Sequence, residues 1–483
     1  MKDDQASGAL ARMGLCSQHR RAAIDEVLSR LEQDGIETVR VLFADQHGIL
    51  RGKTLVAGAM ASTFANGMKV PSTLLLKDTS HRTAFPVWSE DAGVGGGMMQ
   101  GASDVLLVPD PATFRTLPWS LHSAWVLCDV VYPDGRPVPF ASRTILSRAV
   151  DRLADQGLGA TIGLEVEFHI FQRVDDACDH ASSTMPGAPV QTRNLTQGYQ
   201  FLTDARYGEA EAILDDLRRA AQGIGLAVRS VEIEMGPSQF EFTFEPSDPI
   251  TQADAMVMFR SLVKQVCASQ GLHASFMPKP KLENSAANGW HVHQSLRDLA
   301  SGRNLFMPES GDELSVHASA WISGLLAHAQ QASVLIAPTV NSYKRYQPFQ
   351  LAPNRVQWGR DNRGTMLRAL MDAGNPASRI ENRAPDSAVN PHLAIAAQLI
   401  AGLDGVTKGW VAPAPTVTPY DDGADRLPTS LGAAIAAFDQ SELFRTTLGD
   451  HCVDYLVQLK RFEWDRYLAT VSEWEQAEYF NLL

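Results

Sequence analysis

The chain is poor in cysteine, which limits the kinds of structural site that it can form. Five cysteines are spread over 483 residues, without a Cys-x-x-Cys pair. This pattern argues against a disulfide framework and against a structural zinc site, and it suits a reducing compartment. The opening residues, MKDDQASGALARMGLCSQHRR, contain no apolar core of a secretory signal. We therefore expect a cytoplasmic protein.

Long hydrophobic runs and an excess of positive charge are also missing. No segment approaches the roughly 20 apolar residues that a membrane-spanning helix needs. The formal net charge is −13, and a net anion is not attracted to nucleic acid or to an anionic membrane. We expect neither as a partner. Hydrophobic residues make up 45% of the chain, which is enough for a large soluble core.

The glycine-rich loops that bind phosphate are absent as well. No GxGxxG pattern occurs. The segment GILRGKT (48–54) resembles a P-loop, but it has three residues between its glycines where the P-loop needs four. We interpret it as one arm of a β-hairpin. Any bound phosphate must then be held by other groups.

Hydrophobic periodicity predicts a mixture of helices and strands. Residues 20–34 place their apolar side chains on one helical face, and Gly35 ends the helix. The segments 37–43 and 49–56 predict a β-hairpin. Further helices are expected at 142–156, 208–223, 251–270, 313–331, 390–403 and 449–469, and further strands at 103–110, 123–131, 160–171, 225–234, 238–245 and 289–296. The proline- and glycine-rich segment 132–140 is the expected domain boundary.

GLEVEFHIF (163–171) is the first segment that suggests chemistry. Side chains two apart on a strand share a face, so Glu165 and Glu167 point the same way. Two adjacent carboxylates in a half-buried place are costly unless a cation lies between them. The alternative is a solvated edge strand with both carboxylates in water.

Three more segments carry groups of the same kind. EMGPSQFEF contains Glu234 and Glu241, which need a bend near Gly236-Pro237 to point together. NGWHVHQS puts His291 and His293 on one strand face, and RIENRAPD contains Glu381. Carboxylates with an imidazole suit Mg²⁺ or Mn²⁺. Each group alone is more often structural, but together they favour a pair of metal sites.

Arginines gather in the same part of the sequence. The candidates for a functional role lie within 39 residues: Arg345, Arg363, Arg368, Arg379 and Arg383. An arginine-rich run is usually a solvated face, but these arginines alternate with apolar residues and proline. Guanidinium groups bind phosphate and carboxylate through paired hydrogen bonds. With metals and without a P-loop, they indicate phosphoryl transfer.

Six segments together resemble the glutamine synthetase family, type I branch. They are GLEVEFHIF, EMGPSQFEF, FMPKPKLENSAANGWHVHQSL, NSYKRYQPFQLAP, WGRDNRGTMLR and RIENRAPDSAVNPHLAIAAQLIAGLDG, within a resemblance from about residue 36 to the C-terminus. The resemblance implies an α+β fold with a small N-terminal β-grasp domain and a large catalytic domain. We accordingly predict a tail at 1–19, a β-grasp domain at 20–135 and a catalytic domain at 140–483.

The same resemblance implies an activity and an assembly. In the family, ATP phosphorylates the γ-carboxylate of glutamate, and an amine then attacks the acyl phosphate to give an amide. We expect ATP as co-substrate, two to three bound Mg²⁺ or Mn²⁺ ions, and a cytoplasmic homo-oligomer. The family assembles as hexameric rings, usually stacked as a dodecamer with active sites between subunits.

Motif positions of the family imply roles for individual residues. The metal ligands would be Glu167, Glu234 and Glu241 at one site, and Glu165, His291 and Glu381 at the other. Contacts to ATP and phosphate would come from His293, Ser295, Arg363, Arg368 and Arg379. Glutamate would be bound by Arg345, Arg383 and His291, and the catalytic residues would be Arg363, Arg383 and Glu234.

The sequence departs from the family in the loop that closes the site. After NSYKR the family reads roughly LVPGxEAP, and its Glu helps to deprotonate ammonium; here Leu351 takes that place. No Asp or Glu occurs from Asn341 to Trp358. Ammonium is a cation that must be attracted and deprotonated. A loop carrying Leu351, Phe349 and Tyr346 instead offers apolar and aromatic surface.

Other departures also concern the amine and glutamate. Pro71 stands where the family's FDGSS motif has its ammonium-binding Asp, although Asp78 follows, and SAANGWH replaces the usual NGSGMH. Tyr199 and Trp290 complete the predicted acceptor pocket. The closing loop and LLKDTSHRTAFPVW resemble γ-glutamylamide synthetases of the γ-glutamylanilide synthase type. This implies an aromatic amine acceptor, as in aniline degradation.

Three other functions remain open at this point. Ordinary glutamine synthetase would need an acid from elsewhere to replace the missing Glu. A γ-glutamylpolyamine or ethanolamine ligase would be expected to have more acidic groups near the acceptor. A structural relative without catalysis should have lost metal ligands or arginines, whereas all of them are present here.

Overall fold

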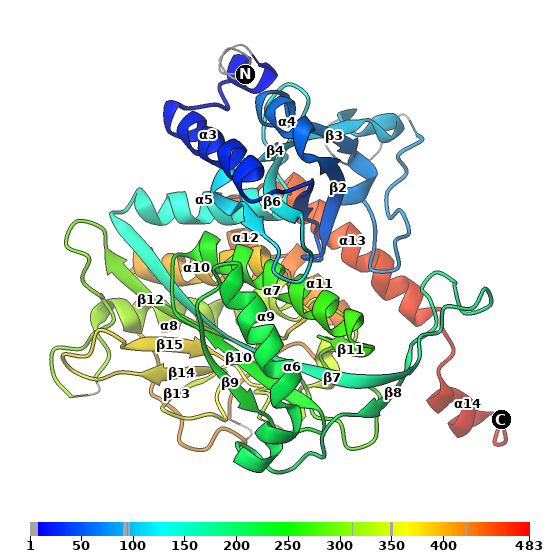
Figure 1. The fold of residues 1–483 in the computed structure, drawn as a ribbon. Helices are drawn as coiled ribbons and strands as arrows, with labels where there is room; N and C mark the ends of the chain where they lie inside the picture. The colour runs from blue at the N-terminus through cyan, green and yellow to red at the C-terminus, as the bar shows by residue number, and fades with distance from the viewer. Residues whose placement is uncertain (1–7, 90–93, 95–96, 312, 348–350, 422) are drawn as a thin grey trace.

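The computed structural model describes residues 8–483 except 90–93, 95–96, 312, 348–350 and 422. A small N-terminal region with its own sheet lies on a layer of helices, and beneath these helices a large curved sheet forms the other side of the protein (Figure 1). The prediction of an α+β fold is confirmed. No helix of the described chain is long and apolar enough to cross a membrane.

The first long helix, α3 (Gln18–Gln33), agrees with the predicted helix at 20–34. The side chain of Ser17 caps its N-terminus by accepting a hydrogen bond from the backbone N–H of Arg20. Ile24 and Val27 lie on its buried face. Gly35 follows with φ +62°, a conformation that glycine adopts without strain.

The N-terminal sheet has the strand order β2-β1-β6-β4-β3, with β5 paired to β6. Its strands are β1 (Thr38–Ala44), β2 (Leu50–Val56), β3 (Met68–Pro71), β4 (Asp104–Pro109), β5 (Arg115–Thr116) and β6 (Ser123–Val131). β1 and β2 form the predicted antiparallel hairpin, and β1 runs parallel to β6. Two short helices, α2 (Ala9–Arg12) and α4 (Met60–Asn66), complete this region. Leu10 of α2 packs in a small core with Leu106 and Val131.

The large sheet has the order β13-β14-β15-β12-β7-β10-β9, with β8 and β11 also paired to β7. Its strands are β7 (Leu158–Asp175), β8 (Gln191–Asn194), β9 (Val228–Ile233), β10 (Gln239–Phe244), β11 (Leu272–Ser275), β12 (Trp290–Asp298), β13 (Trp358–Arg360), β14 (Leu367–Leu370) and β15 (Arg379–Asn382). Leu164, Val166 and Phe168 on β7 are buried in the core. The alternating residues of β7 are therefore free to face the opposite side.

Helices cover the core side of this sheet. The helices that follow the N-terminal region are α5 (Ser142–Ala154), α6 (Asp204–Gly223), α7 (Pro249–Ser269), α8 (Val316–Ala327), α9 (Ala329–Ile336), α10 (Pro391–Lys408), α11 (Leu431–Asp439), α12 (Glu442–Leu448), α13 (Asp450–Leu468) and α14 (Glu473–Tyr479), of which α14 does not pack on the sheet. The helix predicted at 313–331 is instead divided into α8 and α9, because His328 leaves helical geometry at φ −109°. Its ring contacts Asp404 of α10. Helix α14 extends away from the body of the protein (Figure 1).

Specific contacts hold the N-terminal region against the helices. Arg143 on α5 pairs with Asp110 and Asp129 of the N-terminal region and with Asp254 of α7. Burial alone lowers the pKa of Arg143, but the three carboxylates outweigh it and raise the pKa well above the ordinary value. Arg143 therefore stays charged and joins the segments before and after the predicted domain boundary.

Candidate active site

The register of the large sheet brings the predicted metal ligands together. On β7, Glu165 lies opposite His291 of β12, and Glu167 lies opposite Glu241 of β10. On the next strand pair, His293 lies opposite Glu381 of β15. Residues that face one another across antiparallel strands point to the same side of a sheet. All of these side chains therefore gather on one face.

One group consists of three carboxylates, Glu167, Glu234 and Glu241, with one oxygen from each within 4.8 Å of the others. Glu234 follows the end of β9, and the turn after it places Ser238 at φ +59°, which provides the bend expected from the sequence. Glu241 is buried, and its Oε1 has no hydrogen-bond partner in the part of the chain that the structure describes. Glu167 accepts hydrogen bonds from the backbone N–H of Gly289 at 2.7 Å and from Gln239.

The electrostatics of this trio favour a bound cation. Burial, followed by the charge of Glu167, raises the pKa of Glu234 to about 7. The same causes raise the pKa of Glu241 well above its usual range. A divalent ion among the three carboxylates would remove both costs, because it replaces like-charge repulsion by attraction.

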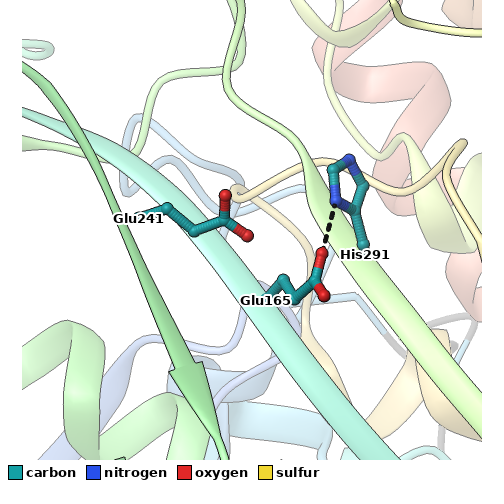
Figure 2. A group of neighbouring side chains, drawn as sticks. All are labelled: Glu165, Glu241 and His291. Atoms are coloured by element: carbon teal, nitrogen blue, oxygen red, sulfur yellow. Dashed lines mark hydrogen bonds and ion pairs between the residues drawn. The ribbon is translucent and has the colours of Figure 1, made fainter. Parts of the chain in front are cut away.

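The second group combines acids and imidazoles. The Nδ1 atom of His291 lies 3.1 Å from Glu165 Oε2 and 3.7 Å from Glu381 Oε1. In Figure 2, Glu165 and His291 point toward one another and Glu241 faces them from the neighbouring strand. The Nε2 atom of His293 lies 2.8 Å from Glu165 Oε1, and Glu165, His293 and Glu381 also have ligand atoms within 4.8 Å of one another. The structure thus places both histidines close enough to share Glu165.

These residues fit hard divalent ions such as Mg²⁺ or Mn²⁺, since carboxylate oxygens dominate and imidazole nitrogens complete the set. Two buried atoms in the groups, Glu241 Oε1 and His293 Nε2, lack a hydrogen bond of proper geometry to any described residue. Gly289 lies beside His291 and Glu167: a Cβ atom there would stand 2.9 Å from His291 Nε2 and 3.3 Å from Glu167 Oε1. Only glycine leaves this space open.

The pKa of Glu234 predicts how the metal-free protein responds to pH. In the unfolded chain the group titrates near 4.5, and in the fold near 7. Between these values the folded state binds more protons, so the free energy of unfolding should fall as the pH rises through about 7. Thermal unfolding in EDTA should therefore show lower stability at about pH 8 than at about pH 5, and added Mn²⁺ should recover most of the difference. An unchanged unfolding temperature in EDTA across this range would contradict the claim that Glu234 binds a proton in the folded, metal-free protein.

The predicted arginines lie around the second group. Glu381 is fully buried and pairs with Arg383 at 2.5 Å and Arg368 at 3.0 Å. Burial opposes ionisation of Glu381, but Arg383 and the two histidines outweigh it and lower its pKa to about 2. Arg379 donates to Nδ1 of His293 at 3.0 Å. The backbone oxygen of Arg363 accepts a hydrogen bond from Arg383, which ties the two segments together.

Arg345 lies next to Gly289, whose backbone N–H binds Glu167 of the trio. It is almost fully buried, and it donates to the backbone oxygen of Ala384 at 3.0 Å. Among the described residues its Nε atom has no hydrogen-bond partner, and its Nη2 atom would stand 3.3 Å from a Cβ placed on Gly289. A buried guanidinium with an unused donor is suited to an anionic ligand.

A cavity of about 340 Å³ opens beside the second group, a size typical of small-molecule sites. Glu165, His293, Ser295 and Arg379 are among its lining residues, and Arg229 lines it from β9. The predicted nucleotide contacts His293, Ser295 and Arg379 therefore share one cavity with a candidate metal ligand. Arg363 and Arg368 are not among its lining residues.

The residues predicted for the acceptor pocket are not all brought together. Trp290 lies in the hydrophobic core, because it alternates with His291 and points to the other face of β12. Tyr346 is buried, and its hydroxyl donates to the backbone oxygen of Ala384. Tyr199 and Leu351 are exposed, and Phe349 lies outside the described residues. Asp78 is buried and forms an ion pair with Arg466 of α13, so its role in this chain is structural.

Sequence reasoning missed Gln239, which supports the site from β10. Its side-chain amide donates to Glu167 and to the side chain of Asn288, and its oxygen accepts from the backbone N–H of Gly236. It thereby connects the carboxylate trio with the loop before β12. Its position two residues before Glu241, on the same face of the strand, was the available signal.

Comparison with known proteins gives consistent results. Residues 140–479 match the family model described as glutamine synthetase, catalytic domain. A γ-glutamylanilide synthase from Acinetobacter sp is 36% identical over 98% of this chain and 99% of that relative. The γ-glutamylethanolamide synthetase GlnA4 from Streptomyces coelicolor is 33% identical over 95% and 96%. A solved structure of apo GmaS without ligand has a TM-score of 0.79 and 29% identity, covering 94% of this chain and 99% of that one.

Proposed function

The chain belongs to the glutamine synthetase family, and from this premise we propose that it joins the γ-carboxylate of L-glutamate to a hydrophobic or aromatic amine. The family and the relatives support its activity as a glutamate–amine ligase. The observation that supports the proposed acceptor is the loop from Asn341 to Trp358, which contains no acid and carries Leu351 at the place of the family's Glu. The γ-glutamylanilide synthase relative supports the same choice.

We assign the two halves of the reaction to the geometry described above. ATP would occupy the cavity lined by His293, Ser295 and Arg379, with its γ-phosphate toward Glu165. Glutamate would bind beside the trio, its carboxylates facing Arg345, Arg383 and His291. The γ-phosphoryl group passes to the γ-carboxylate of glutamate and ADP leaves; the amine nitrogen then forms the amide bond as phosphate departs.

The charged residues would stabilise this transfer. Arg363, Arg368, Arg379 and Arg383 can neutralise phosphate oxygens as charge moves between the two substrates. The six carboxylate and histidine ligands would hold two to three Mg²⁺ or Mn²⁺ ions, which when bound polarise phosphoryl oxygens. Glu234 stands where the trio meets the loop of Tyr199, since the backbone oxygen of Met235 accepts from Tyr199. We propose that its carboxylate accepts the proton that the amine loses.

We also propose the family's assembly for this protein, a cytoplasmic homo-oligomer of hexameric rings stacked as a dodecamer with active sites between subunits. The support is the match to the catalytic family over residues 140–479 and to full-length relatives. Mass measurement in solution tests this directly.

The acceptor is tested by an amine panel. Phosphate release should be followed with glutamate, ATP and, in separate reactions, aniline, isopropylamine, ethanolamine, putrescine and ammonium. We expect aniline-like amines to give the highest kcat/KM. Ammonium outperforming every hydrophobic amine would identify a glutamine synthetase, and a best rate with putrescine or ethanolamine would identify those ligases. No product with any amine would indicate a structural relative.

Leu351→Glu is expected to shift acceptor preference toward ammonium. A carboxylate at this place attracts the ammonium cation and can take its proton. Packing the same carboxylate against an aromatic ring is unfavourable, because the carboxylate loses its hydration without gaining a partner. The ratio of kcat/KM for ammonium to that for aniline should rise by about tenfold or more. Leu351→Met, which keeps an apolar side chain, is the matched control. An equal ratio in both variants would show that this loop does not select the acceptor.

A further inference from the structure

Four polar side chains form a connected network inside the core, behind the strands that carry the second group of candidate metal ligands. Each is at most 1% exposed, and they are Gln294 of β12, Trp321 of α8, Asn382 of β15 and Gln398 of α10. Gln294 follows His293 and Asn382 follows Glu381, so both amides point to the opposite face of the sheet. We call these four side chains the core polar network.

The hydrogen bonds of the network converge on one oxygen atom. The indole N–H of Trp321 donates to Gln294 Oε1 at 2.9 Å, and Gln294 Nε2 donates to Gln398 Oε1 at 3.2 Å. From the other side, Asn382 Nδ2 donates to the same Gln398 oxygen at 2.7 Å, while Asn382 Oδ1 accepts from the backbone N–H of Ala384 at 3.0 Å. An indole and a backbone N–H can only donate, so they fix the orientation of both amides.

Helix α10 is shaped to admit this network. Gly402 lies one helical turn after Gln398, on the same face of the helix. A Cβ atom on Gly402 would overlap the ring of Trp321. Glycine therefore lets the indole lie directly against α10, where its N–H reaches Gln294.

Stability alone does not explain polar groups in this place. The residues opposite Asn382 and Gln294 in the sheet, Val292 and Ile380, belong to the hydrophobic core. Apolar side chains of similar size could fill such positions at little or no cost, since no hydrogen bond would then be required. A fully bonded polar network instead fixes one arrangement of the elements that it joins. We therefore asked which part of the site depends on its geometry.

The network ends at the guanidinium of Arg345. Asn382 is the last residue of β15, and its side chain binds the backbone N–H two residues on, which turns the chain. The oxygen of the same Ala384 accepts from Arg345 Nη1 at 3.0 Å and from the hydroxyl of Tyr346 at 3.2 Å. Among the described residues, Ala384 is the hydrogen-bond partner of the Arg345 guanidinium. The turn at Asn382 thus determines where this guanidinium is held.

We propose that Asn382 is a positioning residue for Arg345 in glutamate binding, and that Gln398, Gln294 and Trp321 hold Asn382 in that role. This inference rests on the proposed function and deepens it, because it adds a residue that lies behind the sheet. Asn382 touches no substrate and acts through the backbone of Ala384.

The pair Asn382→Ala and Asn382→Ser tests the proposal. Both variants lose the contact with Gln398 and leave a cavity of similar size, but only the serine hydroxyl can accept from the N–H of Ala384. We expect the KM for glutamate to rise by about tenfold in Asn382→Ala and by about threefold or less in Asn382→Ser. The KM for ATP and kcat should change by less than about twofold, because the affected interaction binds glutamate before and during the reaction alike.

Thr113→Val is the matched control for a purely structural effect. Thr113 Oγ1 accepts from the backbone N–H of Leu127 at 2.8 Å, which is a buried bond of the same kind in the N-terminal region. The substitution leaves that N–H without its partner and should lower the unfolding temperature. The KM for glutamate should remain that of the unmodified protein.

The outcomes separate this inference from the proposed function. If the unmodified protein forms amides, and Asn382→Ala raises the KM for glutamate no more than Asn382→Ser or Thr113→Val, the positioning role is wrong and the proposed function stands. Titration calorimetry with glutamate in the presence of Mg²⁺ and ADP gives a second measurement. If no amide forms, but the Kd for glutamate rises in Asn382→Ala and not in Asn382→Ser, the proposed function fails and the positioning role stands. Absence of glutamate binding to the unmodified protein would contradict both.

Discussion

Glu241→Gln is expected to reduce ligase activity by about 10²- to 10³-fold and, at the same time, to stabilise the metal-free protein. Glutamine has nearly the same shape as glutamate but cannot supply the anionic oxygen that the trio offers to a cation. Losing one such charge at the transferring phosphate should cost activity on this scale. The loss should appear in kcat with every amine, because phosphorylation of glutamate precedes the amine.

The gain in stability arises because the substitution removes a carboxylate that other carboxylates repel. Glu241 is buried beside Glu167 and Glu234, and its pKa is raised well above the usual range. Glutamine removes the cost of a charge or a bound proton at this place, so in EDTA the unfolding temperature should rise, and more at about pH 8 than at about pH 5.

Differential scanning fluorimetry with and without Mn²⁺ measures both effects on one sample. Mn²⁺ should raise the unfolding temperature of the unmodified protein and should raise that of Glu241→Gln much less. Glu209→Gln, on the surface of α6 and paired with Arg206, is the matched control and should behave like the unmodified protein. Full activity in Glu241→Gln would show that the trio does not hold a catalytic cation.

Arg383→Ala is expected to lower both activity and stability. Arg383 holds the buried carboxylate of Glu381 at 2.5 Å and bonds to the backbone of Arg363. Removing one partner of a buried ion pair costs about 3 kcal/mol, because the other charge is left without its counterion. We expect activity to fall by about 10²-fold or more, since the same guanidinium faces the proposed site of phosphoryl transfer.

Arg383→Lys separates the two roles of this residue. Lysine keeps a positive charge near Glu381 but cannot form the paired hydrogen bonds of a guanidinium. Stability should return largely to that of the unmodified protein while activity remains low. Arg136→Ala breaks an exposed pair with Asp134 and should change the unfolding free energy by less than about 1 kcal/mol. If the Arg383→Ala variant were fully active, Arg383 would have no role in the reaction.

The convergence of the candidate metal ligands could be predicted because it depends on strand parity. Glu165 and Glu167, and likewise His291 and His293, share a face by their spacing alone. Antiparallel register then brings the strands together, as seen where Glu167 lies opposite Glu241. Strand parity does not predict which of these residues belongs to which of the two sites, because Glu165 lies close to both histidines.

Other features could not be read from the sequence for physical reasons. The sequence predicts Trp290 in the acceptor pocket, but Trp290 is adjacent to His291 on β12, and adjacent residues of a strand point to opposite faces, so Trp290 lies in the core. The position of Tyr199 beside Met235 depends on a hydrogen bond between loops that are distant in sequence. Helix α2 is held by Leu10, which is buried only because it packs against Leu106 and Val131 of the N-terminal sheet. Such packing depends on tertiary contacts, which local pattern does not contain.

Anomalous diffraction from crystals soaked in Mn²⁺ and ADP tests the central claim, that these carboxylates and histidines hold divalent ions between nucleotide and glutamate. We predict one manganese peak among Glu167, Glu234 and Glu241, and another beside Glu165, with ADP in the cavity lined by Ser295 and Arg379. Nucleotide bound elsewhere, or no manganese peak between these side chains, would contradict the account.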